Sequence, residues 1–437
     1  MSLSATRQGK YALNPPTSKL LDESQNTRIP RAFWKLLAGY SVSAFGDGMY
    51  LIAINWWILE ATGSAAVLGT VATIGAITLA ALGPLSGRLV DRLGSVPLLI
   101  SSDIWRAVVL SVFVGVAAVA DEPPAISFFV LLVLLMTVGS SFSMPGVFAL
   151  IPTLVPSHSV RRANSILATS RSLAVVGGPA FSGILIAAFG VNPSLLINIG
   201  TFLVSALCLF TIRGSRSEQT RRSSSEDGRV SALRVLLGRR ITTFALSTAL
   251  VGNLALGMYT VALPIKFSTM SDPNSSVLYG VTQAAFQVGM LLLGVLLSLK
   301  KSDRVVTKSL YVFVGVIMMA AGILGVGASS SPAIMVPSAL LVGASLMFIS
   351  VLSDPQLQLQ VPEGHRGAVQ GVVQGVGGAL RPLGIASATI VATSFGIVAP
   401  FVFAAFMLAL LGVLIVSFNG YRDASEEAHS SAGGPNA

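Results

Sequence analysis

Five ionisable side chains interrupt otherwise apolar stretches of this sequence, and they are the first residues to consider for chemistry. They are Asp47, Asp103, Arg106, Arg171 and Arg381. At the centre of a lipid bilayer, one charged side chain costs about 2.5 to 3.5 kcal/mol on insertion scales unless it is paired or faces water. Within a membrane, such residues are therefore candidates for binding an ion, carrying a proton or holding helices together.

Asp47 lies between Gly46 and Gly48, near the middle of an apolar stretch over residues 34–58. A carboxylate at that depth can take up and release a proton, or it can bind a cation. Two other interpretations stay open. Asp47 forms a structural salt bridge, or the helix boundary differs and Asp47 lies nearer to the helix end.

Two of the other charges are spaced as a pair. Asp103 and Arg106 are three residues apart in the stretch 96–119, so they lie on one face of a helix. We expect them to form a structural charge pair that braces the helices. Arg381 precedes Pro382 and has no acidic neighbour in the sequence. It binds an anionic group, stabilises an ionised Asp47, or packs against backbone carbonyls.

The apolar stretches themselves predict an all-α membrane protein. Of the 437 residues, 53% are hydrophobic and 11% are charged, against roughly 25% charged in soluble domains. A membrane-spanning helix needs about 20 apolar residues. Twelve stretches qualify, at 34–58, 65–86, 96–119, 126–150, 164–188, 193–212, 241–265, 277–298, 305–328, 332–353, 367–393 and 398–418.

Polar segments divide the chain into two halves. Residues 1–31 are predicted to be a disordered leader, and the Ser- and Arg-rich segment 213–240 is typical of a flexible linker. Between them lies an N-terminal bundle over 32–212, and a C-terminal bundle follows over 241–418. Each bundle holds six predicted spans, and a polar tail over 419–437 ends the chain.

The basic residues predict the orientation of these spans. If both ends of the chain are cytoplasmic, 24 of the 28 Lys and Arg residues lie on that side, and Lys266 lies in an external loop. Basic residues concentrate on the cytoplasmic side of membrane proteins. The net charge of +10 is therefore a signal of topology and does not indicate nucleic-acid binding.

The two halves also repeat each other in sequence. The repeated pieces include Gly48-Met49-Tyr50 and Gly257-Met258-Tyr259, Val155-Pro156 and Val361-Pro362, and Phe189-Gly190 and Phe395-Gly396. A duplicated set of spans is typical of a transporter, because two similar bundles can rock against each other around a central site. The repeat therefore predicts a membrane carrier.

A motif after the second span resembles the signature of a known transporter family. Gly87, Asp91 and Arg92 have the spacing of the loop between spans two and three in the major facilitator superfamily, which this segment resembles. The resemblance implies two pseudo-symmetric six-helix bundles. It also implies a gating loop, in which glycine lets helices approach and the carboxylate docks on a neighbouring helix. A tight turn with solvated charges is the alternative.

A second set of motifs resembles the efflux branch of that superfamily, which includes macrolide exporters and the enterobactin exporter. The set includes Ser143-Met144-Pro145, Leu154-Val155-Pro156 and Leu359-Gln360-Val361-Pro362. Gly178 and Pro179, followed by Gly183, resemble the fifth-span motif of antiporters. Proline frees a backbone carbonyl there and glycine lets the helix bend. A kink that serves only packing is the alternative.

The same resemblance places spans one and five together beside a central cavity. Arg171, in the fifth span, then becomes the candidate partner of Asp47, and Arg381 approaches from the opposite bundle. We therefore predict that Asp47, Arg171 and Arg381 couple the binding of a proton or cation to movement of the bundles.

Together these features predict a proton-coupled exporter in the bacterial plasma membrane that works by alternating access. Its expected substrate is an amphipathic small molecule such as a drug, a secondary metabolite or a siderophore, and a monomer without metal or cofactor is expected. A proton-linked importer of the same fold and a non-transporting receptor or assembly factor are the alternatives. An enzyme is not expected, because the spans hold no histidine cluster, nucleophile constellation or phosphate-binding loop.

Overall fold

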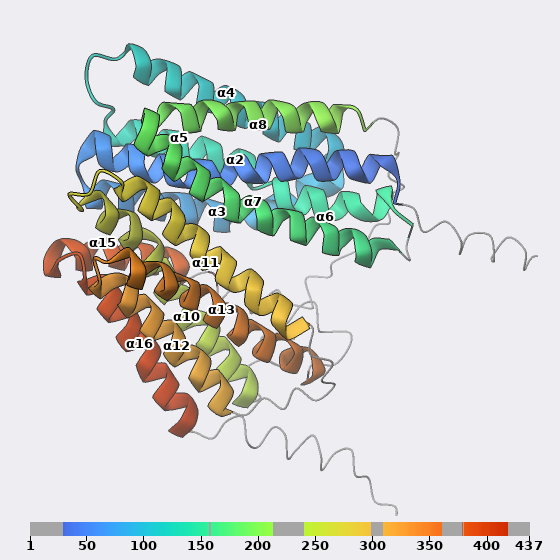
Figure 1. Ribbon diagram of the computed structural model, residues 1–437. Coiled ribbons are helices and arrows are strands. Elements are labelled where there is room, and N and C mark those ends of the chain that lie inside the picture. The colour runs from blue at the N-terminus through green and yellow to red at the C-terminus, as the bar shows by residue number, and fades with distance from the viewer. Residues whose placement is uncertain are drawn as a thin grey trace, which may run out of the picture.

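The regular elements of the described part of the chain are helices, and they form two bundles. The computed structural model describes residues 29–156, 159–212, 240–298, 309–360, 378 and 380–417. Every regular element within these residues is a helix, as the hydropathy pattern predicts. The two bundles correspond to the N-terminal and C-terminal halves of the sequence (Figure 1).

The N-terminal bundle contains α2 (Arg31–Thr62), α3 (Ala65–Leu93), α4 (Ser95–Val119), α5 (Ile126–Ser140), α6 (Ser143–Leu154), α7 (Val160–Phe189) and α8 (Asn192–Phe210). Helices α5 and α6 follow each other along one pass, separated at Ser141 and Phe142. The fourth predicted span is thus broken into two helices. The other predicted spans of this half each correspond to a single helix.

The C-terminal bundle contains α10 (Arg240–Ser268), α11 (Ser275–Ser298), α12 (Ser309–Ala328), α13 (Pro332–Gln360), α15 (Arg381–Phe395) and α16 (Ala399–Ser417). Across the described residues, eleven segments are long and apolar enough to cross a membrane, and 380–395 is a shorter apolar helix. That short helix is the second part of the predicted span 367–393. Most of its first part lies outside the described residues.

Apolar side chains on the outside of the bundles fit a lipid environment. On α4, Val108, Val112 and Val116 are exposed and follow one another at intervals of four residues, so they form a stripe along one helix face. The opposite face of α4 buries Leu99, Asp103 and Arg106. A soluble protein rarely exposes apolar area of this extent, so the outer stripe indicates contact with lipid.

The two ends of the bundles differ in how closely the halves approach. We call the end at which α2 begins and α16 ends the tail side, and the opposite end the loop side. Figure 1 shows the halves close together at the loop side and diverging toward the tail side. Helix α7 packs against α11 and helix α3 packs against α15, so each half lends two helices to the main contacts between the bundles.

Small residues allow this close approach on the loop side. A methyl group placed on Gly183 of α7 would lie 2.6 Å from the backbone oxygen of Ser276 on α11 and 3.3 Å from the Cα atom of Gly280. The hydroxyl of Ser276 donates to the backbone oxygen of Gly183 at 3.3 Å. Backbone therefore meets backbone at this crossing, as small residues permit in membrane helices.

The internal repeat of the sequence corresponds to a repeated helix contact. In the N-terminal half, Gly48 of α2 lets α7 approach, since an added methyl group would lie 2.9 Å from the Cδ atom of Pro179. In the C-terminal half, Gly257 of α10 lets α15 approach, and an added methyl group would lie 3.1 Å from the Cα atom of Gly384. The recurring Gly-Met-Tyr pieces thus mark equivalent helix crossings.

Two predicted boundaries differ from the structure. The segment predicted as a loop after residue 86 is helical, because α3 continues to Leu93 and only Gly94 separates it from α4. Gly94 has φ 85°, a left-handed value that glycine adopts without strain, so a sharp reversal fits in one residue. Lys266, predicted in an external loop, lies within α10 and is buried.

Candidate functional site

The charged residues of the N-terminal bundle meet in one place, which we call the acid–arginine cluster: Asp47, Asp103 and Arg106. The Nη1 atom of Arg106 donates to both carboxylate oxygens of Asp47, at 3.0 and 3.1 Å. Its Nη2 atom donates to Asp103 and, at 3.3 Å, to the hydroxyl of Ser43. One guanidinium group thus holds two carboxylates that come from two helices.

The sequence of α2 orients Asp47 toward this cluster. Ser43 and Asp47 are four residues apart, so they share a helix face, and both contact Arg106. The glycines on either side of Asp47 let α2 pack tightly on both flanks. Gly46 lies against α8 and Gly48 lies against Pro179 of α7. These two contacts fix the rotation of α2 about its axis, and with it the direction in which the Asp47 side chain points.

Helices α4, α5 and α8 enclose the other two members of the cluster. The guanidinium carbon of Arg106 lies 4.1 Å from the centre of the Phe202 ring, and Ser205 of α8 hydrogen-bonds to Asp103. Gly139 of α5 leaves room for the arginine, because a methyl group there would lie 2.6 Å from its Cγ atom. A buried charge of this kind is tolerated only when it is paired and hydrogen-bonded.

Burial differs sharply within the cluster. The side chain of Asp47 is 45% exposed, whereas those of Arg106 and Asp103 are 2% and 6% exposed. Helix α2 contacts α10 and α11 of the other half, so Asp47 lies on a helix at the boundary between the bundles. The two carboxylates thus share one guanidinium group, and only Asp47 is open to solvent.

The pairing of Asp47 differs from the one predicted. Arg106 takes the place expected for Arg171, because α2 meets α7 through Ser41, Phe45 and Gly48, while Asp47 points toward α4. The side chain of Arg171 is exposed on α7. Within the described residues it forms no ion pair.

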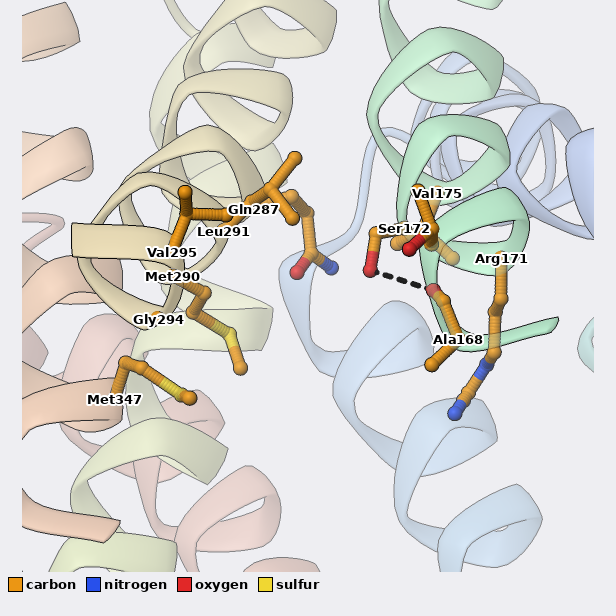
Figure 2. A pocket seen from close by; sticks show the side chains of 11 residues that line it. Ala168, Arg171, Ser172, Val175, Gln287, Met290, Leu291, Gly294, Val295 and Met347 are labelled. Carbon is orange, nitrogen blue, oxygen red and sulfur yellow. Dashed lines mark hydrogen bonds between the residues drawn. The ribbon is translucent and has the colours of Figure 1, made fainter. Parts of the chain in front are cut away.

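Arg171 instead lines a cavity between the two halves. The cavity has a volume of about 470 Å³ and lies between α7 and α11, with one residue from α13 (Figure 2). Ligand cavities for drug-sized molecules are commonly about 300 to 1,000 Å³. Its lining residues are Ala168, Thr169, Arg171, Ser172, Val175, Gln287, Met290, Leu291, Gly294, Val295 and Met347. The tail-side halves of α7 and α11 supply most of them, so the cavity lies where the bundles diverge.

Arg381 is the first residue of α15, and its side chain is exposed. Pro382 follows at the first turn of the helix, where proline fits because the missing N–H has no partner in any case. Arg381, which the hydropathy pattern places within the span 367–393, therefore lies at the start of a helix in the structure. As for Arg171, no ion pair of Arg381 occurs in the part of the chain that the structure describes.

The antiporter-like motif lies where α7 touches both halves. Pro179 is inside α7, Gly178 gives α2 room beside Phe45 and Gly48, and Gly183 gives α11 room. Next to it, the hydroxyl of Ser182 hydrogen-bonds to the backbone oxygen of Met49 at 3.1 Å. A bend in α7 would therefore change its contacts with α2 in one bundle and with α11 in the other.

The predicted gating residues lie on the last turns of α3. Gly87 and Arg92 belong to this helix, and the side chain of Arg92 is exposed at the tail side. Asp91 is helical too, but its side chain lies outside the described residues. Its proposed docking contact stays a prediction.

Two features of the structure were not predicted from the sequence. The Nζ atom of Lys266 donates to the backbone oxygens of Val326, Gly327 and Ser329, at 2.7, 2.5 and 2.6 Å. Val326 and Gly327 belong to the last turn of α12 and Ser329 follows it, and a cation at this helix end is favoured by the helix dipole. The second feature joins the bundles: the side-chain amide of Asn55 donates to the hydroxyl of Tyr279.

The charged groups of the site do not include a metal centre. Among the described residues, no group of three or more His, Cys, Asp or Glu side chains is placed to hold a metal ion. The described residues offer a cavity of a size that suits a small molecule, and a cluster in which one arginine holds two carboxylates.

Comparisons with known proteins agree with this geometry. The sequence matches the model of the Major Facilitator Superfamily over residues 36–384. Macrolide efflux protein A of Streptococcus pyogenes is 24% identical over 403 residues, which cover 89% of this chain and 96% of that protein. The multidrug efflux pump Tap of Mycolicibacterium fortuitum is 28% identical over 405 residues, which cover 90% of this chain and 96% of the pump.

A solved structure extends the likeness to the fold. The crystal structure of nucleoside transporter NupG superposes with a TM-score of 0.65, covering 89% of this chain and 99% of that one, at 14% sequence identity. At that identity the likeness shows the arrangement of helices alone.

Proposed function

This chain belongs to the Major Facilitator Superfamily, and from that premise we propose that it exports drug-like amphipathic molecules in exchange for protons. Export is supported by relatives that match nearly the whole chain and are named macrolide efflux protein A and multidrug efflux pump Tap. We place the protein in the plasma membrane of a bacterium, where it acts as a monomer. Secondary metabolites and siderophores belong to the same class of substrate.

The observation that carries the proton coupling is the contrast within the acid–arginine cluster. The side chain of Asp47 is 45% exposed, and its partner Arg106 is enclosed. A proton that binds Asp47 removes the charge that holds the Nη1 atom of Arg106. Because a charge-assisted hydrogen bond is about twice as strong as a neutral one, the tie between α2 and α4 weakens. Helix α2 also contacts α10 and α11, so its movement reaches the other half.

The arrangement of the bundles supports a state that is ready to load substrate. The halves meet on the loop side, and the cavity lies in their tail-side half. Helix ends on the tail side carry basic side chains, including Arg31, Lys35, Arg88, Arg92 and Arg162. Because such residues concentrate on the cytoplasmic side, we assign the tail side to the cytoplasm. An exporter in this state takes its substrate from the cytoplasm.

The wider coupling network predicted from the sequence stays a prediction. In this arrangement Asp47 pairs with Arg106, while Arg171 and Arg381 are exposed. Coupling through those two arginines requires that Asp47 changes partner in another arrangement of the bundles.

Transport by the purified protein in liposomes tests the proposed function. We expect the neutral drug chloramphenicol to accumulate in proteoliposomes with an acidic lumen, and a protonophore to abolish the accumulation. Accumulation only when the outside is acidic would identify a proton-linked importer instead. Failure of chloramphenicol, ethidium and erythromycin to move under either gradient would favour a receptor or assembly role.

A further inference from the structure

The two walls of the cavity between the halves differ in chemistry. The α7 wall carries Arg171, Thr169 and Ser172, whereas the opposite wall carries Met290 and Met347 with one polar side chain, Gln287 (Figure 2). The hydroxyl of Ser172 is used within α7, where it donates to the backbone oxygen of Ala168 at 2.9 Å. Arg171 is therefore the strongest free hydrogen-bond donor that the described lining offers to a ligand.

The positive charge of Arg171 is not balanced within the cavity. None of the lining residues is acidic, and no ion pair of Arg171 occurs among the described residues. Asp47, its expected partner, has both carboxylate oxygens bound to Arg106. An exposed guanidinium in a cleft of low polarity attracts anions and repels cations. It also binds a carboxylate or phosphate group with two parallel hydrogen bonds.

Arg171 lies where a ligand that enters the cavity would meet its positive charge. It lies in the tail-side half of α7, and Figure 2 shows its side chain extending past Ala168 along the helix. The bundles diverge toward the tail side (Figure 1). A molecule that enters between them from that side therefore meets this side chain in the cavity.

The methionine wall adapts to apolar bodies of different shapes. Gly294 of α11 leaves the space that Met347 occupies, since a methyl group there would lie 2.9 Å from the Cε atom of that methionine. Methionine is unbranched and polarizable, and methionine-rich surfaces repack around varied ligands. This wall suits the apolar part of a ligand and leaves its polar end free to face α7.

We infer that the cavity selects its substrates by charge, and that it binds amphipathic anions in preference to cations. The apolar body lies against Met290 and Met347, and the anionic group pairs with Arg171. This inference rests on the proposed function, because it names the class of molecule that the exporter loads. It concerns binding alone and involves no proton transfer.

Equilibrium binding to the full-length protein in lipid nanodiscs tests this inference. The probes are three dansyl-labelled eleven-carbon chains that end in a carboxylate, a primary amide or an amine. We expect the parent protein to bind the carboxylate about tenfold more tightly than the amine, which corresponds to about 1.4 kcal/mol. Arg171→Gln should remove this preference, and Arg171→Lys should keep part of it because the charge remains.

Two further variants separate charge selection from general effects. Arg162→Gln removes another exposed arginine of α7 that does not line the cavity, and it should keep the preference of the parent. Met347→Leu should weaken all three probes by similar factors and leave the order of affinities unchanged. An equal preference in Arg171→Gln and in the parent would overturn the inference, and so would a parent that binds the amine most tightly.

The outcome is independent of whether the protein exports anything. Binding is measured without a gradient, so failed proton-driven transport would refute the proposed function and leave the charge preference standing. Conversely, chloramphenicol transport with no charge preference would refute only the inference.

Discussion

The side-chain amide nitrogen of Asn55 lies 3.0 Å from the hydroxyl oxygen of Tyr279, and this hydrogen bond joins α2 of one half to α11 of the other. The ring of Trp56 stacks on Tyr279 with the ring centres 6.5 Å apart. Both contacts lie on the loop side, opposite the cavity. They make Tyr279, which is buried, a residue that helps to hold the loop side closed.

Removing the hydroxyl should loosen this closure. Tyr279→Phe keeps the ring contact but loses a hydrogen bond worth about 0.5 to 1.5 kcal/mol, which corresponds to a shift of roughly two- to tenfold toward loop-side opening. Spin labels at Gly63 and Ser271, in a protein without Cys208, would report the change as a larger share of long distances. Tyr311→Phe, at an exposed tyrosine of α12, is the matched control. Identical distance distributions in Tyr279→Phe and the parent would contradict this role.

The crossing of α7 and α11 should respond to a single methyl group. In Gly183→Ala the new methyl would meet the backbone of α11 at 2.6 Å, and backbone cannot move aside as a flexible side chain can. We expect the two helices to separate on the loop side, with a loss of about 1 to 3 kcal/mol, typical of overpacking. The same spin labels measure it. Gly115→Ala, where an added methyl has open space, should behave like the parent.

Arg106 should be essential for stability as well as for coupling. Arg106→Leu leaves Asp103 buried without its ion-pair partner, and breaking a buried pair in this way costs about 3 to 5 kcal/mol. The apparent Tm in detergent should fall clearly. The double variant Arg106→Leu with Asp103→Leu should recover part of the loss, because the only carboxylate of the cluster that then lacks a partner is Asp47, whose side chain is 45% exposed. If Arg106→Leu were as stable as the parent, burial of Asp103 without Arg106 would carry no measurable cost, which would contradict this role.

The contacts that the sequence predicted are the ones set within a single helix. Asp103 and Arg106 face each other because a spacing of three residues brings side chains together on any helix. The pairing of Asp47 depends instead on how far α2 is rotated against its neighbours. Gly46 and Gly48 determine that rotation through contacts with α8 and α7. The spacing of residues along the sequence does not indicate whether Arg106 or Arg171 lies opposite Asp47.

Hydropathy gave the number and approximate position of the spans, but it did not place charges near their ends. Lys266 was predicted in a loop because the apolar stretch 241–265 ends just before it. It is stable inside α10 since the end of α12 offers three carbonyl oxygens to it. Hydropathy also placed the end of α3 too early. This helix continues to Leu93, and its polar last turns lie at the tail-side end of the bundle.

Orientation can be tested directly with single cysteines. Both termini and the segment 213–240 should be cytoplasmic, since most basic residues would otherwise have to cross the membrane. In a protein whose Cys208 is replaced by Ala, a cysteine at Gly63 should react with a membrane-impermeant maleimide in intact cells. A cysteine at Ser224 should react only after lysis. The reverse pattern would invert the topology and the proposed direction of loading.

The role of Asp47 is best separated from its structural contacts by a pair of conservative changes. Asp47→Asn keeps one oxygen to accept a hydrogen bond from Arg106, and Asp103 still balances the guanidinium, so the protein should fold. It loses the group that gains and releases a proton. Proton-driven accumulation of chloramphenicol should therefore fall to the level seen without a pH gradient, while exchange down the drug's own gradient continues.

Asp47→Glu restores a carboxylate on a longer side chain and should recover part of the proton-driven accumulation. Exchange measured with and without the pH gradient separates a loss of coupling from a loss of folding, because a misfolded variant loses both. An Asp47→Asn protein that still concentrates chloramphenicol when the lumen is acidic would show that Asp47 is a structural partner of Arg106. The coupling proton would then have to bind another group.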